Sequence, residues 1–205
     1  MSAHQYVEGQ LPPEPEKATL EGRNKVLGFW IFLGAEVVLF GTLFSAFIAL
    51  RHQVLDGPHP SHLFELPMIF AATMILLTSS LMSVFAVQAM HRNKIKALIG
   101  WLFATVLLGL SFLGLEIFEF YTYVGEGHRM NTSAFSSSFY TLVGFHGAHV
   151  AFGILWISLL IGQLYKKGLN VVTAPKVYVS MIYWHFIDVV WVFIFSVVYL
   201  MGKVG

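Results

Sequence analysis

The sequence predicts an all-α integral membrane protein, a bundle of five transmembrane helices. Three observations lead to this fold class: 57% of the 205 residues are hydrophobic, only 11% are charged, and the apolar residues gather in five long stretches. The charged share is about half of that in ordinary soluble domains. Because so little charge cannot cover the surface of a soluble domain of this size, a bilayer is the expected solvent.

Each of the five stretches is long enough to cross a hydrocarbon core, which needs about 20 residues at a rise of about 1.5 Å per residue. Backbone N–H and C=O groups in lipid must be satisfied within the segment, so each stretch is expected to be a helix. We place the spans at about 27–50, 66–90, 97–124, 134–164 and 177–202. Together they make one transmembrane domain, residues 23–205.

Residues 1–22 have a different composition. Pro12, Pro13 and Pro15 stand among several glutamates, and the segment has no apolar core of the kind that a cleavable signal peptide needs. We interpret it as a cytoplasmic N-terminal tail that is disordered or loosely docked.

Lysine and arginine alternate between the two sides of the predicted bundle. One side carries Lys17, Arg23, Lys25, Arg92, Lys94, Lys96, Lys166, Lys167 and Lys176. The other side carries only Arg51, Arg129 and Lys203. By the positive-inside rule, the N-terminus is expected in the cytoplasm and the C-terminus outside.

Several classes of function are excluded or disfavoured by composition. The chain contains no cysteine, which excludes disulfides, iron–sulfur clusters, thiolate copper sites and covalent haem attachment through CxxCH within it. Its basic residues are too thinly spread for a nucleic-acid surface. Nucleotide-binding loops, nucleophile elbows and zinc-protease motifs do not occur. On its own the chain does not look catalytic.

Ionisable groups inside spans are the first functional candidates, because they are costly in lipid. They are Glu36, Glu116, Glu119, His146, His149, His185 and Asp188. By helix rise, Glu36, His149 and Asp188 fall within about one turn of the midplane, and His185 about one turn toward the cytoplasm. Glu116 and Glu119 fall nearer the outer face.

Spacing indicates which of these groups share a helix face. His146 and His149, His185 and Asp188, and Glu116 and Glu119 are i, i+3 pairs. We therefore expect a polar layer in which Glu36, His149, His185 and Asp188 meet across the first, fourth and fifth spans, with Asp188 the partner of His185.

Two interpretations of this layer stay open. Two histidine pairs near carboxylates are suitable metal or haem ligands, although the Glu-x-x-His pairs of di-iron bundles are absent. Alternatively, the groups hydrogen-bond one another and lock helices together, as is common in membrane bundles. Under the first interpretation the chain would be a free-standing haem protein. If Glu36 and Asp188 instead lined a path through the bundle, the chain would be an ion transporter. We prefer the second, structural interpretation.

Four segments resemble subunit III of cytochrome c oxidase, the five-helix bacterial form of this haem–copper terminal oxidase subunit. Phe145–Val150 resembles its Phe/Thr-His-Gly-x-His-Val motif, and Tyr183–Trp191 resembles the signature of its last helix. Gly34–Glu36 is similar to its intramembrane acidic position, and Glu116–Phe120 to its glutamate-rich helix. The resemblance covers roughly residues 24 to 202.

The resemblance implies a subunit without haem, copper or a catalytic residue of its own, in the bacterial cell membrane. It implies that haem and copper lie in partner subunits, that subunit I packs directly against this chain, and that subunit II and a small subunit IV complete the complex. It also implies bound phospholipid and a role in proton uptake and in sustained turnover, with Glu36 as the buried carboxyl. Quinol oxidases of the same superfamily carry similar subunits, so the electron donor is either cytochrome c, which we favour, or quinol.

Overall fold

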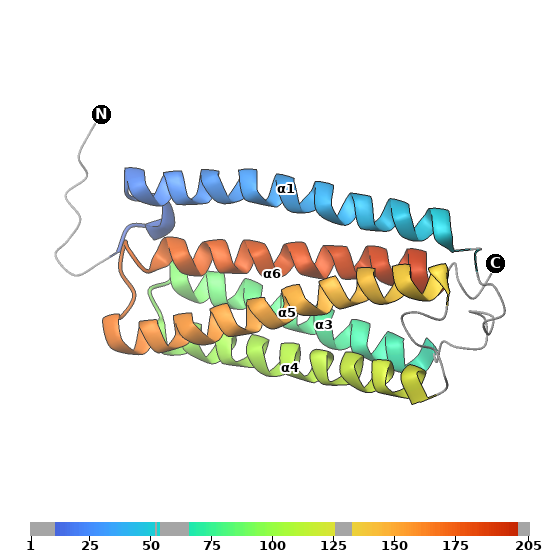
Figure 1. Ribbon diagram of the computed structural model, residues 1–205. Helices are drawn as coiled ribbons and strands as arrows, with labels where there is room; N and C mark the ends of the chain where they lie inside the picture. Colours follow the sequence, from blue (N-terminus) through green and yellow to red (C-terminus); the bar gives the residue numbers. More distant parts are fainter. Residues whose placement is uncertain (1–10, 52, 54–65, 126–132, 201–205) are drawn as a thin grey trace.

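Five long helices dominate the computed structural model of the chain, which describes residues 11–51, 53, 66–125 and 133–200 (Figure 1). They are α1 (Leu20–Leu50), α3 (Leu66–His91), α4 (Ile95–Gly125), α5 (Ala134–Lys167) and α6 (Ala174–Ile194). A short 3₁₀ helix, η1 (Pro15–Lys17), precedes α1, and a π-helical stretch, η2 (Phe195–Leu200), continues α6. All five helices are long and apolar enough to span a membrane. The predicted all-α fold with five spans is confirmed.

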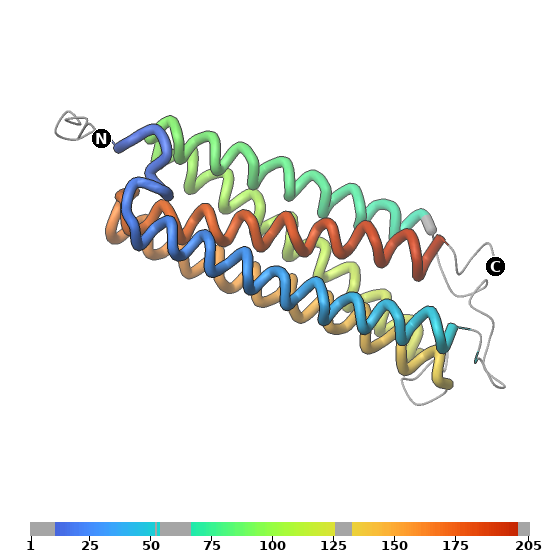
Figure 2. Tube along the Cα trace, turned by 90° about the horizontal axis from the view of Figure 1, so that it is seen from above, coloured from blue at the N-terminus to red at the C-terminus, as the bar shows by residue number. Residues whose placement is uncertain are grey.

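Helix α6 is the element around which the others pack. It contacts α1, α3 and α5, while α3 makes its most extensive contact with α4, and α4 in turn packs on α5. Half of the apolar segment of α6 is buried inside the bundle, compared with 17% of that of α1. Helix α1 therefore lies along one side, against α5 and α6 (Figures 1 and 2).

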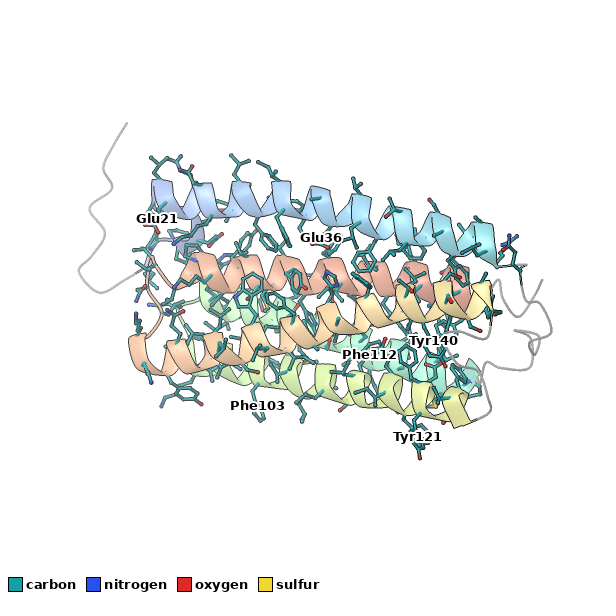
Figure 3. All side chains as sticks on the ribbon, viewed as in Figure 1. Glu21, Glu36, Phe103, Phe112, Tyr121 and Tyr140 are labelled. Carbon is teal, nitrogen blue, oxygen red and sulfur yellow. The ribbon has the colours of Figure 1, made fainter. Side chains whose placement is uncertain are left out.

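The outer surface of the bundle is apolar, as expected for a protein in lipid. Phe112 points from α4 into the interior and is fully buried, whereas Phe103 and Tyr121 of the same helix point outward and are 61% and 78% exposed (Figure 3). A water-soluble protein rarely exposes apolar surface on this scale.

The first helix begins earlier than the sequence predicted, at Leu20 instead of about residue 27. Thr19 caps it, because its hydroxyl oxygen accepts the backbone N–H of Gly22 at 3.0 Å. Before the cap, Glu16 is almost completely buried and its carboxylate lies 3.2 Å from Nε2 of His91, at the end of α3. The polar segment that was expected as a tail up to residue 22 is thus attached to the bundle from η1 onward.

The other spans agree closely with the predicted ranges. Residues 1–10, Arg129 and Lys203, which entered the prediction of the tail and of orientation, lie outside the described residues.

Two glycines create the space for the largest side chain of the core. The indole of Trp184 in α6 is almost fully buried between α4 and α5. A Cβ atom on Gly109 of α4 would lie 2.7 Å from its Cη2, and one on Gly153 of α5 would lie 3.0 Å from its Cζ3. Both glycines are therefore required by close approach rather than by backbone conformation.

We expect Gly109→Ala to destabilise the bundle by about 1–3 kcal/mol, because the added methyl forces the rigid indole out of its site. The matched control is Gly114→Ala in the same helix, where a Cβ would meet nothing within 4 Å. Thermal unfolding of the two variants in detergent measures the difference. Equal stability of the two variants would contradict the packing described for Trp184.

Candidate functional site

The polar side chains inside the spans fall into separate groups rather than one layer. Glu36 pairs with His149 between α1 and α5, and His185 bonds to serines between α3 and α6. Glu116 and Glu119 face the interior from α4, and His146 is buried within the core. The structure thus joins Glu36 to His149 as expected, but places His185 in a different helix contact.

Glu36 and His149 form the only interhelical contact among the described residues that joins a carboxyl to an imidazole inside the spans. Glu36 points from α1 toward the bundle (Figure 3), and its Oε2 lies 3.1 Å from His149 Nε2. His149 Nδ1 lies 2.7 Å from the carbonyl oxygen of Phe145, which only accepts, so Nδ1 carries a proton. One further proton therefore lies between Glu36 and Nε2, either on the acid or on the ring.

His185 obtains both of its partners from α3. Its Nδ1 lies 2.7 Å from the hydroxyl of Ser80, and its Nε2 lies 3.1 Å from the hydroxyl of Ser83. Ser83 donates its own hydrogen to the carbonyl oxygen of Ser80, at 2.7 Å, so it accepts from Nε2. A neutral ring then accepts the Ser80 hydroxyl at Nδ1, and both ring nitrogens are satisfied.

Asp188 is not the direct partner that the sequence predicted for His185. Its carboxyl instead interacts with the hydroxyl of Ser80, so one serine lies between the acid and the imidazole. The i, i+3 spacing places both residues on one face of α6. However, both ring nitrogens of His185 are hydrogen-bonded to serines of α3, so neither bonds directly to Asp188.

Two tryptophans of α6 continue this contact with α3. Trp184 Nε1 donates to the hydroxyl of Ser79, and Trp191 Nε1 donates to the hydroxyl of Thr73, each at 3.0 Å. The four side chains are buried. Because an indole N–H in a dry core needs an acceptor, these bonds fix the register of α3 against α6.

The two glutamates of α4 have different surroundings. Glu119 accepts the hydroxyl of Tyr123 at 2.5 Å and that of Tyr199, in η2, at 3.4 Å. Neither carboxyl oxygen of Glu116 has a hydrogen-bond partner among the described residues, although the side chain is only 4% exposed. The Glu116 carboxyl lies against Gly147 of α5, where a Cβ would come within 3.0 Å of it.

His146 is fully buried beside aromatic rings. Its Nε2 donates to the carbonyl oxygen of Ile187, at 3.3 Å, and its ring lies 5.1 Å from that of Trp191 and 5.9 Å from that of Phe112. Nδ1 has no partner in the described part of the chain. His146 therefore ties α5 to α6 through a backbone carbonyl.

This arrangement favours hydrogen bonding over metal ligation for His149 and His185. Each of these rings uses both nitrogens in bonds to other groups of the protein, so a metal would have to displace one of them. Within the ranges that the structure covers, histidine, aspartate and glutamate do not form a group of three or more that could hold a metal ion.

Sequence reasoning missed the hydroxyl partners. Thr73, Ser79, Ser80 and Ser83 lie in a span without formal charge, and Tyr123 and Tyr199 were not among the candidates named from the sequence. A signal was present for Thr73, Ser80 and Ser83, whose spacing of seven and three residues places them on one face of a helix.

The fold and its interior define a polytopic membrane protein whose buried polar side chains mostly connect one helix to the next. Comparison with known families places it further: the family model for cytochrome c oxidase subunit III matches residues 8–203. The chain belongs to this family and is a subunit III of a haem–copper oxidase.

Relatives of both donor types are similar over nearly the whole chain. Cytochrome c oxidase subunit 3 of Bacillus sp. (strain PS3) is 60% identical over 195 residues, covering 95% of this chain and 94% of the relative. The protein of that name in Bacillus subtilis (strain 168) is 57% identical, with 95% and 94% covered. Quinol oxidase subunit 3 of the same strain is 50% identical over 184 residues, with 90% of each chain covered.

We expect Ser80→Ala to lower the free energy of unfolding by about 1–2 kcal/mol, because it leaves a buried imidazole nitrogen without its partner. The control is Ser45→Ala in α1, whose exposed hydroxyl donates only to Gly41 of its own helix. In a double-mutant cycle with His185→Phe, the coupling energy should be about 0.6–1.7 kcal/mol. A coupling near zero would show that the serine and the histidine do not support each other.

Proposed function

We propose that this chain is the non-catalytic subunit III of a bacterial proton-pumping cytochrome c oxidase. It belongs to the enzyme as an accessory part, while haem and copper are held by partner subunits. The observation that carries the proposal is the use of His149 and His185: all four ring nitrogens bond to other groups of this chain. Family membership supplies the enzyme to which such a helix scaffold belongs.

The proposed orientation places the N-terminus in the cytoplasm and the C-terminus outside. Helix α1 begins and η2 ends at opposite ends of the bundle (Figure 1), as an odd number of spans requires. The α3–α4 connection, the start of α4 and the end of α5 lie at the end of the bundle where α1 begins (Figure 1), and these segments contain Lys94, Lys96, Lys166 and Lys167. This distribution of basic residues supports insertion into the bacterial cytoplasmic membrane with that end inside.

Partner contacts are proposed for the exposed apolar faces. Large hydrophobic side chains cover the outward surfaces of α1 and α4, including Trp30, Ile31, Val38, Phe103 and Phe118, each at least 58% exposed. In the complex we assign these surfaces to bound phospholipid and to subunit I, with subunit II and a small subunit IV further away.

Cytochrome c is the electron donor that the comparisons favour. Within Bacillus subtilis (strain 168), the cytochrome c oxidase subunit is 57% identical to this chain and the quinol oxidase subunit is 50% identical. The complex should therefore oxidise reduced cytochrome c faster than a quinol when both are offered to the purified enzyme. A faster reaction with quinol would assign the chain to the alternative, a quinol oxidase.

Purification through a tag on this chain tests the accessory role. We expect the intact complex to carry haem and copper, detected by its optical spectrum and by metal analysis, and the chain purified alone to carry neither. Stoichiometric haem or iron on the isolated chain would contradict the proposal, as would ion flux in liposomes that contain it alone. His149→Phe would then identify the ligand, since the haem band would disappear with it.

A second prediction concerns the pair of Glu36 and His149. Glu36→Gln keeps a hydrogen bond to Nε2 but removes the exchangeable proton of the pair. We expect assembly and haem content to stay as in the unmodified enzyme, while oxidase activity decays faster during sustained turnover. The measurement is oxygen consumption followed to inactivation.

The control for this experiment is Gln88→Glu near the end of α3, outside the pair. It replaces an amide by a carboxyl, which is the reverse of the exchange in Glu36→Gln. An unchanged rate of decay in Glu36→Gln, or loss of haem from the complex, would contradict a proton-linked role of Glu36.

A further inference from the structure

A small cavity lies beside the two glutamates of α4. It has a volume of about 10 Å³ and is lined by residues of α3, α4 and α6. Glu116 and Glu119 are its two acidic lining residues, and Ile69, Phe112 and Trp191 are among the apolar ones. A space of about 10–15 Å³ is the minimum that holds a single water molecule. The cavity therefore has room for one water between two carboxyl groups.

Glu116 lines this cavity, and no described protein group satisfies its carboxyl. Both of its oxygens are buried and unpartnered among the described residues, and the side chain is 4% exposed. The ion pairs that the described residues form do not include it. An ionised carboxylate without a counter-charge or a hydrogen-bond donor is very costly in such an environment, so Glu116 is expected to be the neutral acid.

Glu119, one turn further along α4, is the better of the two carboxyls at holding negative charge. It accepts two tyrosine hydroxyls, whereas Glu116 accepts none. Two carboxylates on one face of a helix also repel each other, so the pair retains a proton more readily than either group alone. Both effects place the shared proton on Glu116.

The remaining titratable neighbours do not change this assignment. Those that interact with the pair are Tyr123 on α4, Tyr140 on α5 and Tyr199 on η2, while His146 on α5 lies against Phe112, a residue of the cavity lining. Tyr123 and Tyr199 direct their hydroxyls to Glu119, and His146 donates Nε2–H to a backbone carbonyl. None of these neighbours is a lysine or an arginine.

We propose that Glu116, Glu119 and a single water in this cavity form a buried proton-binding site, in which neutral Glu116 donates to the water and the water donates to Glu119. The site lies in α4 and is separate from the Glu36–His149 pair, to which the proton-linked role was assigned above. Proton movement within it breaks the O–H bond of Glu116 and forms a new O–H bond on the water, which passes one of its own protons to Glu119. The two carboxyls then exchange their protonation states without any change in total charge.

Infrared difference spectroscopy of the intact complex tests the protonation. We expect Glu116→Gln to remove one band from the carbonyl-stretch region of protonated carboxyl groups, a band that shifts when the unmodified enzyme is transferred to heavy water. Glu36→Gln serves as the control, because it should leave this band in place. If Glu116→Gln removes no such band, Glu116 is ionised and the proposal is wrong.

The water is tested through the glycine that faces Glu116. A Cβ on Gly147 would lie 2.8 Å from Oε2 of Glu116, so Gly147→Ala pushes the carboxyl into the cavity and expels the water. We expect the Glu116 band to shift to higher frequency, as for a carbonyl that loses a hydrogen bond, and a water O–H band sensitive to isotope-labelled water to disappear.

Gly144→Ala is the matched control on the same helix, since a Cβ there meets nothing within 4 Å. It should leave both bands unchanged. A Glu116 band that is unaltered by Gly147→Ala, or the absence of any isotope-sensitive water band in the unmodified enzyme, would overturn the bridging water. Glu116→Gln is nearly isosteric, so the protonation can still be read if Gly147→Ala does not assemble.

Discussion

The contact between α3 and α6 is the interaction on which the rest of the bundle depends. In lipid there is little hydrophobic gain from packing one apolar helix on another, so hydrogen bonds and close fit decide which faces meet. Here Trp184, His185 and Trp191 take their partners from hydroxyls of α3. Since α6 also contacts α1 and α5, fixing it against α3 positions both.

The same helix couples hydrogen bonding to packing. The indole of Trp184 donates to Ser79 and at the same time fills the space left by Gly109 and Gly153. A shift of α6 along its axis would break the bond and drive the ring into backbone. The interior therefore accepts one register, which keeps the polar groups of α1, α4 and α5 at fixed places relative to one another.

The sequence was sufficient to predict the five spans and one of the polar pairs. It was not sufficient to predict the direction in which a side chain points around its helix axis. Hydropathy gives helix number, and helix rise gives depth, which is why Glu36 and His149 were placed at one level and are indeed paired. Depth does not say which way a side chain faces around its helix, so His185 was assigned to the same layer although α3 supplies its partners. The early start of α1 was missed because a contact between the buried Glu16 and His91 attaches a segment whose composition is typical of a solvated tail.

The polar groups inside the spans differ in their number of hydrogen-bond partners, and this number distinguishes groups that connect helices from groups that hold a proton. A group that connects helices needs a matched acceptor or donor, and His185 has two. Glu36 and His149 satisfy each other but hold a proton that is able to lie on either group. Glu116 has a cavity in place of a protein partner. Because an unsatisfied buried carboxyl costs more than the packing contact it makes, its retention beside Gly147 is better explained by a bound water and a stored proton than by helix association.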